Sequence, residues 1–134
     1  MKTDLAQFID TYCQAWSEPD AQRRAQLLAQ VWSDGATYTD PTVHAAGSGK
    51  LLAHIAKVVA RRPGARIVRT SAVDEHHGLA RVSWRLVEAD GTPRPEGIDF
   101  VELSADGRIR RIVGFFGPLD ASESSMSGNA QKDR

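Results

Sequence analysis

The sequence predicts a single α+β domain: three N-terminal helices packed on a curved antiparallel sheet, in the shape of a cone-shaped α+β barrel. Apolar residues recur at helical spacing in the first half of the chain, whereas the second half is rich in strand-forming residues. Glycine-containing turns separate the β-rich segments. Because such a sheet cannot cover both of its faces, we expect the helices to fill its concave side and leave a pocket at the open end.

The three helices follow from apolar periodicity and from residues that begin or end a helix. The first has one apolar stripe that includes Tyr12 and Trp16. The second begins at Pro19 or Asp20, and Ser48 is a candidate cap for the third. We expect the helices over residues 4–16, about 20–32 and 50–62.

The strands come later in the chain. A short β-like run at 36–39 ends at Asp40-Pro41, residues 42–49 read as a loop, and four longer segments are expected at 66–76, 80–89, 97–105 and 108–117. Turn signals between these four segments predict antiparallel hairpins. The domain is expected over residues 1–119, and the polar stretch 120–134 is predicted to be a disordered tail.

Composition restricts the function classes. Lys plus Arg and Asp plus Glu both number 17, which gives no general support for nucleic-acid binding. We find no apolar run of membrane-spanning length, no signal-peptide pattern, and a single cysteine, so a cytoplasmic protein without membrane contact is expected. No cysteine or histidine spacing indicates a metal site, and no cofactor is expected.

Four arginines form a local basic cluster, which we interpret as a solvated face: Arg61, Arg62, Arg66 and Arg69.

The order of these elements, with Asp40-Pro41 after the first short strand, resembles the nuclear transport factor 2-like superfamily, and most of all its SnoaL-like cyclases and ketosteroid isomerases. The resemblance covers about residues 4–119. Tyr12 stands eight residues before Asp20, and Asp99 stands eight before a hairpin glycine, as in the isomerases. The resemblance implies a cone-shaped barrel with a deep apolar pocket, and a homodimer formed through the sheet.

The same resemblance implies roles for three residues. Asp40 would be the general base, and Tyr12 with Asp99 would form an oxyanion hole. The residues themselves support part of this, because both faces of the strand around Asp99 are apolar, and a carboxyl buried without a cation stays protonated. A structural alternative stays open: Asp40 as a turn initiator, Tyr12 bonded to a backbone carbonyl, and Asp99 held by the backbone or by an arginine.

Seven more side chains, aromatic, histidine or apolar, are expected to line the pocket: Trp16, Trp32, His44, His54, Trp84, Val101 and Phe116. If Asp40 is not the base, His44 or His54 is the alternative, as histidines serve in related dehydratases. The isomerases support their oxyanion tyrosine with further tyrosines, and Trp32 and Lys57 occupy the corresponding positions here.

The predicted function is that of a cofactor-independent isomerase, or of a polyketide cyclase-like enzyme. It would remove a proton next to the carbonyl of a small apolar molecule. The alternative is a non-catalytic module on the same fold that binds a small molecule or docks a protein. The enzyme hypothesis predicts that Tyr12, Asp40 and Asp99 converge on one cavity, whereas the binding hypothesis predicts a surface Asp40 and an ionised Asp99 beside an arginine.

Overall fold

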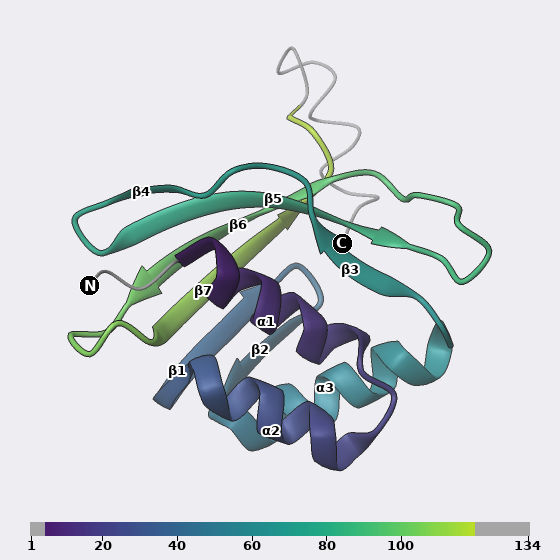
Figure 1. The fold of residues 1–134 in the computed structure, drawn as a ribbon, viewed down its shortest axis with the longest axis horizontal. Helices are drawn as coiled ribbons and strands as arrows, with labels where there is room; N and C mark the ends of the chain where they lie inside the picture. Colours follow the sequence, from purple (N-terminus) through teal and green to yellow (C-terminus); the bar gives the residue numbers. More distant parts are fainter. Residues whose placement is uncertain (1–4, 120–134) are drawn as a thin grey trace.

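The computed structural model describes residues 5–119 (Figure 1), and its helices lie on one face of a curved sheet. The helices are α1 (Leu5–Ser17), α2 (Ala21–Val31) and α3 (Ser48–Arg61). The strands are β1 (Trp32–Asp40), β2 (Val43–Ala46), β3 (Arg66–Arg69), β4 (Asp74–His76), β5 (Leu79–Val87), β6 (Gly97–Leu103) and β7 (Ile109–Phe116). The predicted α+β class with three helices is confirmed, and the predicted tail over 120–134 lies outside the described residues.

The sheet is mixed, which corrects the expectation of a wholly antiparallel one. Its strand order is β2-β1-β7-β6-β5-β3, with β4 also paired to β5. Strand β1 runs parallel to β7, and the other pairings are antiparallel. Hairpin signals specify only pairings between consecutive strands, so they could not predict that β1 joins the last strand of the chain. With β2 and β3 at opposite ends of the order, the sheet stays open.

Three element boundaries differ from prediction. The expected loop 42–49 contains β2, which pairs with β1 across a tight turn. Strand β1 begins at Trp32, and Gly35, expected to end a helix, lies inside the strand at φ +76° beside a register shift against β7. A β-bulge accounts for this, because glycine adopts positive φ readily and the extra residue bends the strand. The segment 66–76 is divided into β3 and β4.

The hydrophobic core lies between the helices and the concave face of the sheet. Its largest fully buried side chains come from α2, α3 and β7: Leu28, Val31, Leu51, Ile55, Ile109 and Ile112. Burial of each such side chain contributes about 1.5–3 kcal/mol to folding. None of the helices between residues 5 and 119 combines the length and apolar character needed to cross a membrane.

The turn between α1 and α2 is fixed by polar contacts. The Asp20 carboxylate accepts a hydrogen bond of 2.9 Å from the backbone N–H of Arg23 and so caps α2. The buried Arg24 guanidinium donates to the carbonyl oxygens of Glu18 and Pro19 at 3.0 and 3.1 Å. These contacts satisfy two of the donors of a charged group that would be costly to bury alone.

Candidate active site

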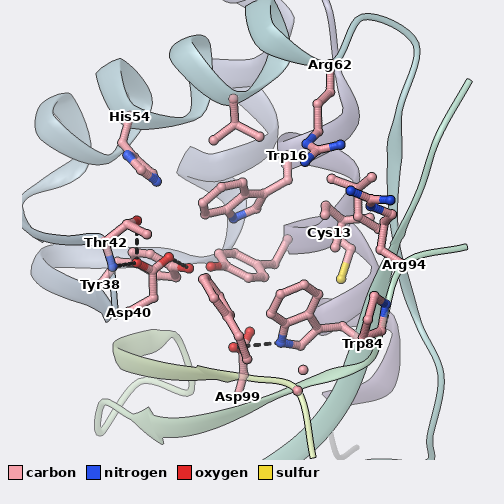
Figure 2. A pocket seen from close by; sticks show the side chains of 18 of the residues that line it. Cys13, Trp16, Tyr38, Asp40, Thr42, His54, Arg62, Trp84, Arg94 and Asp99 are labelled. Atoms are coloured by element: carbon pink, nitrogen blue, oxygen red, sulfur yellow. Dashed lines mark hydrogen bonds between the residues drawn. The ribbon is translucent and has the colours of Figure 1, made fainter. Parts of the chain in front are cut away.

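A cavity of about 510 Å³ lies between the sheet and helices α1 and α3 (Figure 2). This volume lies within the range of small-molecule sites. The structure brings all three candidate catalytic residues, Tyr12, Asp40 and Asp99, to the wall of this one cavity. Four of the expected pocket residues also line it: Trp16, His54, Trp84 and Phe116.

Three residues expected in the pocket lie elsewhere. Trp32 is buried behind Tyr12, with the two rings stacked at a centroid distance of 6.0 Å. Val101 points into the core and is only 2% exposed, because the sheet is covered by helices at that level. His44 is exposed on the edge strand β2, where its Nδ1 lies 2.7 Å from the Thr39 hydroxyl.

Gly114 of β7 lies between the two aspartates. Asp99 of β6 pairs directly with Gly114, and the parallel register of β1 brings Asp40 to the other side of β7. A Cβ atom at position 114 would lie 2.8 Å from Asp99 Oδ1 and 3.7 Å from both Asp40 Cβ and the Tyr38 hydroxyl. The missing side chain therefore leaves the space in which these polar groups approach one another.

The Asp99 carboxyl is buried and held by an indole. Trp84 Nε1 donates a hydrogen bond of 3.0 Å to Asp99 Oδ1, and Gly97 allows this approach, since a Cβ there would lie 2.5 Å from the Trp84 ring. Burial raises the pKa of Asp99 to about 7; the charge of Asp40 adds to the shift and the Trp84 bond opposes it. Because Oδ1 accepts from the indole, the proton of the neutral acid is free to sit on Oδ2.

No arginine pairs with Asp99 between residues 5 and 119, so this structural alternative is not observed. The ion pairs in this part of the chain involve other carboxylates. The carboxyl lies in the apolar surroundings that its strand pattern predicted. Its location in the cavity wall makes a neutral Asp99 available as a hydrogen-bond donor to a ligand.

Tyr12 lines the cavity, and its hydroxyl group is buried without a partner among the described residues. Its side chain is 3% exposed, and its hydroxyl makes no hydrogen bond within the part of the chain that the structure describes. Burial raises its pKa well above the usual value, and the charge of Asp99 adds to the shift. The indole N–H of Trp16 is likewise buried and without an acceptor there. Two cavity-lining residues therefore each carry an unpaired buried donor, and such donors are costly to leave without an acceptor.

Asp40 takes part in the turn and in the cavity at once. Its Oδ1 accepts from the backbone N–H and hydroxyl of Thr42, both at 2.7 Å, and from the Val43 N–H at 3.1 Å. Its Oδ2 accepts a bond of 2.6 Å from the Tyr38 hydroxyl. The turn bonds fix the orientation of the carboxylate, and Oδ2 keeps a lone pair for a proton.

Tyr38 is a site residue that the sequence analysis missed. It lines the cavity beside Asp40, and its ring lies 5.3 Å from Trp16 and 6.3 Å from His54 between centroids. Burial raises its pKa, which keeps the hydroxyl protonated as a donor to Asp40. The available signal was the i, i+2 spacing of the two residues, because alternate residues of a strand share one face.

Two further titratable groups line the cavity. Burial lowers the pKa of His54, and the cations Arg61 and Lys57 add to this, while Asp40 opposes it. Burial raises the pKa of Cys13 to about 12, so its thiol is protonated and not nucleophilic at neutral pH. Between residues 5 and 119 no cluster of three or more His, Cys, Asp or Glu side chains could hold a metal ion.

The comparisons identify the relatives of this chain. The family model of the SnoaL-like domain matches residues 9–112. A SnoaL-like protein from Agrobacterium tumefaciens, provisionally named an isomerase, is 36% identical and superimposes with a TM-score of 0.78 over 84% of this chain and 96% of that one. The fold is that of the nuclear transport factor 2-like superfamily. Within it, the chain belongs to the SnoaL-like family.

More distant structures show the same fold. An NTF2-like protein of unknown function from Exiguobacterium is 17% identical, with a TM-score of 0.66 over 84% of this chain and 99% of that one. A Jannaschia protein, provisionally named a SnoaL-like polyketide cyclase, is 14% identical, with a TM-score of 0.61 over 87% and 90%. The search of curated proteins finds no match. The resemblance predicted from the order of elements is thus confirmed at the level of family and fold.

Proposed function

We propose that this protein is a cofactor-independent isomerase or cyclase that abstracts a proton next to the carbonyl of a small, mainly apolar molecule. One observation carries the proposal: Tyr12, Asp40 and Asp99 line the same cavity. The names of the SnoaL-like relatives support the reaction class. The largely aromatic interior of the cavity suits a mainly apolar molecule.

In the proposed reaction, Asp40 Oδ2 takes the proton from the carbon next to the substrate carbonyl. The electron pair of the broken C–H bond forms the enolate double bond, and negative charge develops on the carbonyl oxygen. The Tyr12 hydroxyl and the protonated Oδ2 of Asp99 donate hydrogen bonds to that oxygen. Donors fixed in a water-poor site stabilise such charge strongly, and loss of one typically costs about 10²–10³ in rate.

The enolate then has two outcomes. In an isomerisation, the proton on Asp40 returns to a different carbon of the conjugated system. In a cyclisation, the enolate carbon attacks a second carbonyl carbon of the same molecule, a C–C bond forms, and the new alkoxide takes the proton. Both outcomes return Asp40 to the carboxylate without an external oxidant or reductant.

A non-catalytic binding function is the second candidate, and the surroundings of Asp40 favour it. The carboxylate already accepts four hydrogen bonds, which is typical of a structural turn residue. In that case Tyr12 and Asp99 would bind a ligand oxygen, and no proton would leave carbon. The two candidates therefore share an oxyanion-type site and differ in the role of Asp40.

The first experiment titrates a graded series of phenols and 2-naphthol, whose oxygens imitate an enolate, into wild-type protein and the Asp99→Asn and Tyr12→Phe variants. We expect each variant to weaken binding by roughly tenfold, the cost of a lost charge-assisted hydrogen bond. Equal binding by all three proteins would exclude the oxyanion hole.

The second experiment separates enzyme from binder. NMR would follow deuterium exchange at the acidic carbon of 2-tetralone in D₂O, with wild-type protein and Asp40→Asn. Exchange that is catalysed by the wild type and lost in the variant supports proton abstraction. Binding of 2-tetralone without accelerated exchange would favour the non-catalytic candidate.

A further inference from the structure

Three arginines line the cavity, and two of them, Arg62 and Arg94, lie on the side remote from Asp40. Arg61 and Arg62 come from the C-terminal end of α3, and Arg94 comes from the connection between β5 and β6. Figure 2 shows Arg62 and Arg94 across the cavity from Asp40, with the aromatic side chains between them. Arg61 is exposed and Arg62 is partly exposed, as a solvated face predicts, but both also line the cavity.

The carboxylate near these arginines cannot neutralise all of them. Arg62 donates a hydrogen bond to Glu88 Oε2, and Arg94 Nε lies 3.4 Å from the same oxygen. One carboxylate is thus shared by two guanidinium groups, and the ion pairs found between residues 5 and 119 include none to Arg61. This end of the cavity therefore has a net positive charge.

The positive end is accessible and borders an apolar wall. The side chains of Arg62 and Arg94 are 40% and 50% exposed, so their remaining N–H donors can reach an entering molecule. Ile67 and Leu86 line the cavity as well. Arg85 Nε donates to the Arg94 carbonyl oxygen at 3.1 Å, which holds the backbone of this connection in place.

A last-turn arginine also interacts favourably with the helix dipole, which is a structural role for Arg61. A helix dipole cannot account for the position of Arg94, which belongs to no helix. It also does not account for the fact that Arg62 and Arg94 line the same cavity. Guanidinium groups bind carboxylates through parallel N–H donors, and they do so best beside apolar surface where water is scarce.

We propose that the ligand of this cavity is an amphiphilic carboxylate, whose apolar body fills the aromatic interior while its carboxylate binds Arg62 and Arg94. The other end of the ligand would carry the carbonyl oxygen that reaches Tyr12 and Asp99, and this part rests on the proposed function. The arginines then fix the orientation of the ligand, because only one end of it carries a charge. They are specificity-determining residues and take no part in proton transfer.

The test compares two ligands with the same ring system by calorimetry at about pH 6, where the carboxylate of one is ionised and both hydroxyls are neutral. The ligands are 2-naphthol and 6-hydroxy-2-naphthoate, whose carboxylate lies at the end remote from the hydroxyl. We expect the naphthoate to bind roughly tenfold more tightly. Arg62→Gln and Arg94→Gln should each weaken naphthoate binding roughly threefold to fivefold and leave 2-naphthol binding unchanged.

Two further variants guard against an indirect effect on folding. Glu88→Gln removes the carboxylate that competes for the arginines, so it should strengthen naphthoate binding, a direction that general destabilisation cannot produce. Arg81→Gln changes an exposed arginine that pairs with Asp74 and does not line the cavity, and it should change neither affinity.

The outcomes separate this proposal from the proposed function. The carboxylate proposal is overturned if the naphthoate binds no more tightly than 2-naphthol, or if both arginine variants keep its higher affinity. In that case the proposed function still stands, provided that 2-naphthol binding depends on Asp99. The converse result is that the higher affinity of the naphthoate is lost in the arginine variants, while Asp99→Asn changes the affinity of neither ligand. That result supports the carboxylate site and overturns the oxyanion hole.

Discussion

The Tyr38 hydroxyl donates a hydrogen bond of 2.6 Å to Oδ2 of Asp40, so the two side chains act as one polar unit at the end of β1. The unit is fixed from both directions, by the turn bonds to Asp40 Oδ1 and by the packing of the Tyr38 ring against Trp16. Tyr12, by contrast, has a buried hydroxyl with no partner between residues 5 and 119. Two tyrosines of one cavity therefore differ in what their hydroxyls contribute to folding.

We expect opposite effects from removing these two hydroxyls. Tyr38→Phe breaks a formed bond to a carboxylate and should lower the free energy of unfolding by about 1–2 kcal/mol. Tyr12→Phe removes an unsatisfied donor, so stability should stay the same or rise by up to about 1 kcal/mol. Urea unfolding of both variants measures the difference, and an equal loss in the two would show that the Tyr12 hydroxyl has a partner in the free protein.

Asp99 should make stability depend on pH. Burial raises the pKa of Asp99 from an ordinary value of 3.8 to about 7 in the folded protein. At pH values between these two, the folded chain therefore keeps a proton on Asp99 that the unfolded chain has lost. Its contribution is fully present below about pH 4 and is lost as pH rises through 7, by an amount on the order of 4 kcal/mol. Asp99→Asn cannot ionise, so its stability relative to wild type should rise between pH 4 and 8. A constant difference over that range would contradict the raised pKa.

Gly114 should tolerate no side chain. Gly114→Ala would place Cβ 2.8 Å from Asp99 Oδ1, the oxygen that accepts the Trp84 hydrogen bond, so this carboxyl must shift. We expect about 1–3 kcal/mol of destabilisation and a loss of phenol binding. Gly49→Ala is the matched control, since nothing lies within 4 Å of its added Cβ and alanine is the better helix former. Wild-type phenol affinity in Gly114→Ala would show that the gap has no role in the site.

The family resemblance predicts a homodimer formed through the sheet. On the sheet face opposite Asp99, Phe100 and Phe115 are 45% and 50% exposed, and their ring centroids lie 5.9 Å apart. We expect a dimer in sedimentation velocity for the wild type, and a monomer for Phe115→Arg. Gln14→Arg, an exposed position on α1, should leave the dimer intact. A wild-type protein that sediments as a monomer would refute this prediction.

Local patterns were sufficient to predict much of the fold. The apolar stripes predicted all three helices, and each predicted helix end lies within two residues of the observed one. The glycine-containing turns predicted the hairpins that join β5, β6 and β7. The apolar neighbours of Asp99 predicted its burial and its raised pKa. These features depend on residues close together in sequence, which is why the sequence alone could predict them.

Features that depend on distant contacts were not predictable in this way. The parallel pairing of β1 with β7 joins segments that lie far apart in the sequence, and no local signal specifies it. Tyr38 had a local signal in its i, i+2 spacing from Asp40. However, its place in the cavity depends on packing against Trp16 and His54, which are distant in sequence. Trp32 was assigned to a helix, and its position at the start of β1 places it behind Tyr12 and outside the cavity. Arg62 and Arg94 are far apart in sequence and come together only in the folded protein, where both contact Glu88.

The parallel pairing of β1 with β7 also has a consequence for how the chain acquires its site during folding. Asp40 and Asp99 meet only when the last strand inserts between β1 and β6, a step that closes a very long loop. Closure of such loops is entropically costly, and contacts of this kind form slowly. On a ribosome, the helices and β1 would emerge well before β7, so the cavity would stay unformed until synthesis of the domain was nearly complete.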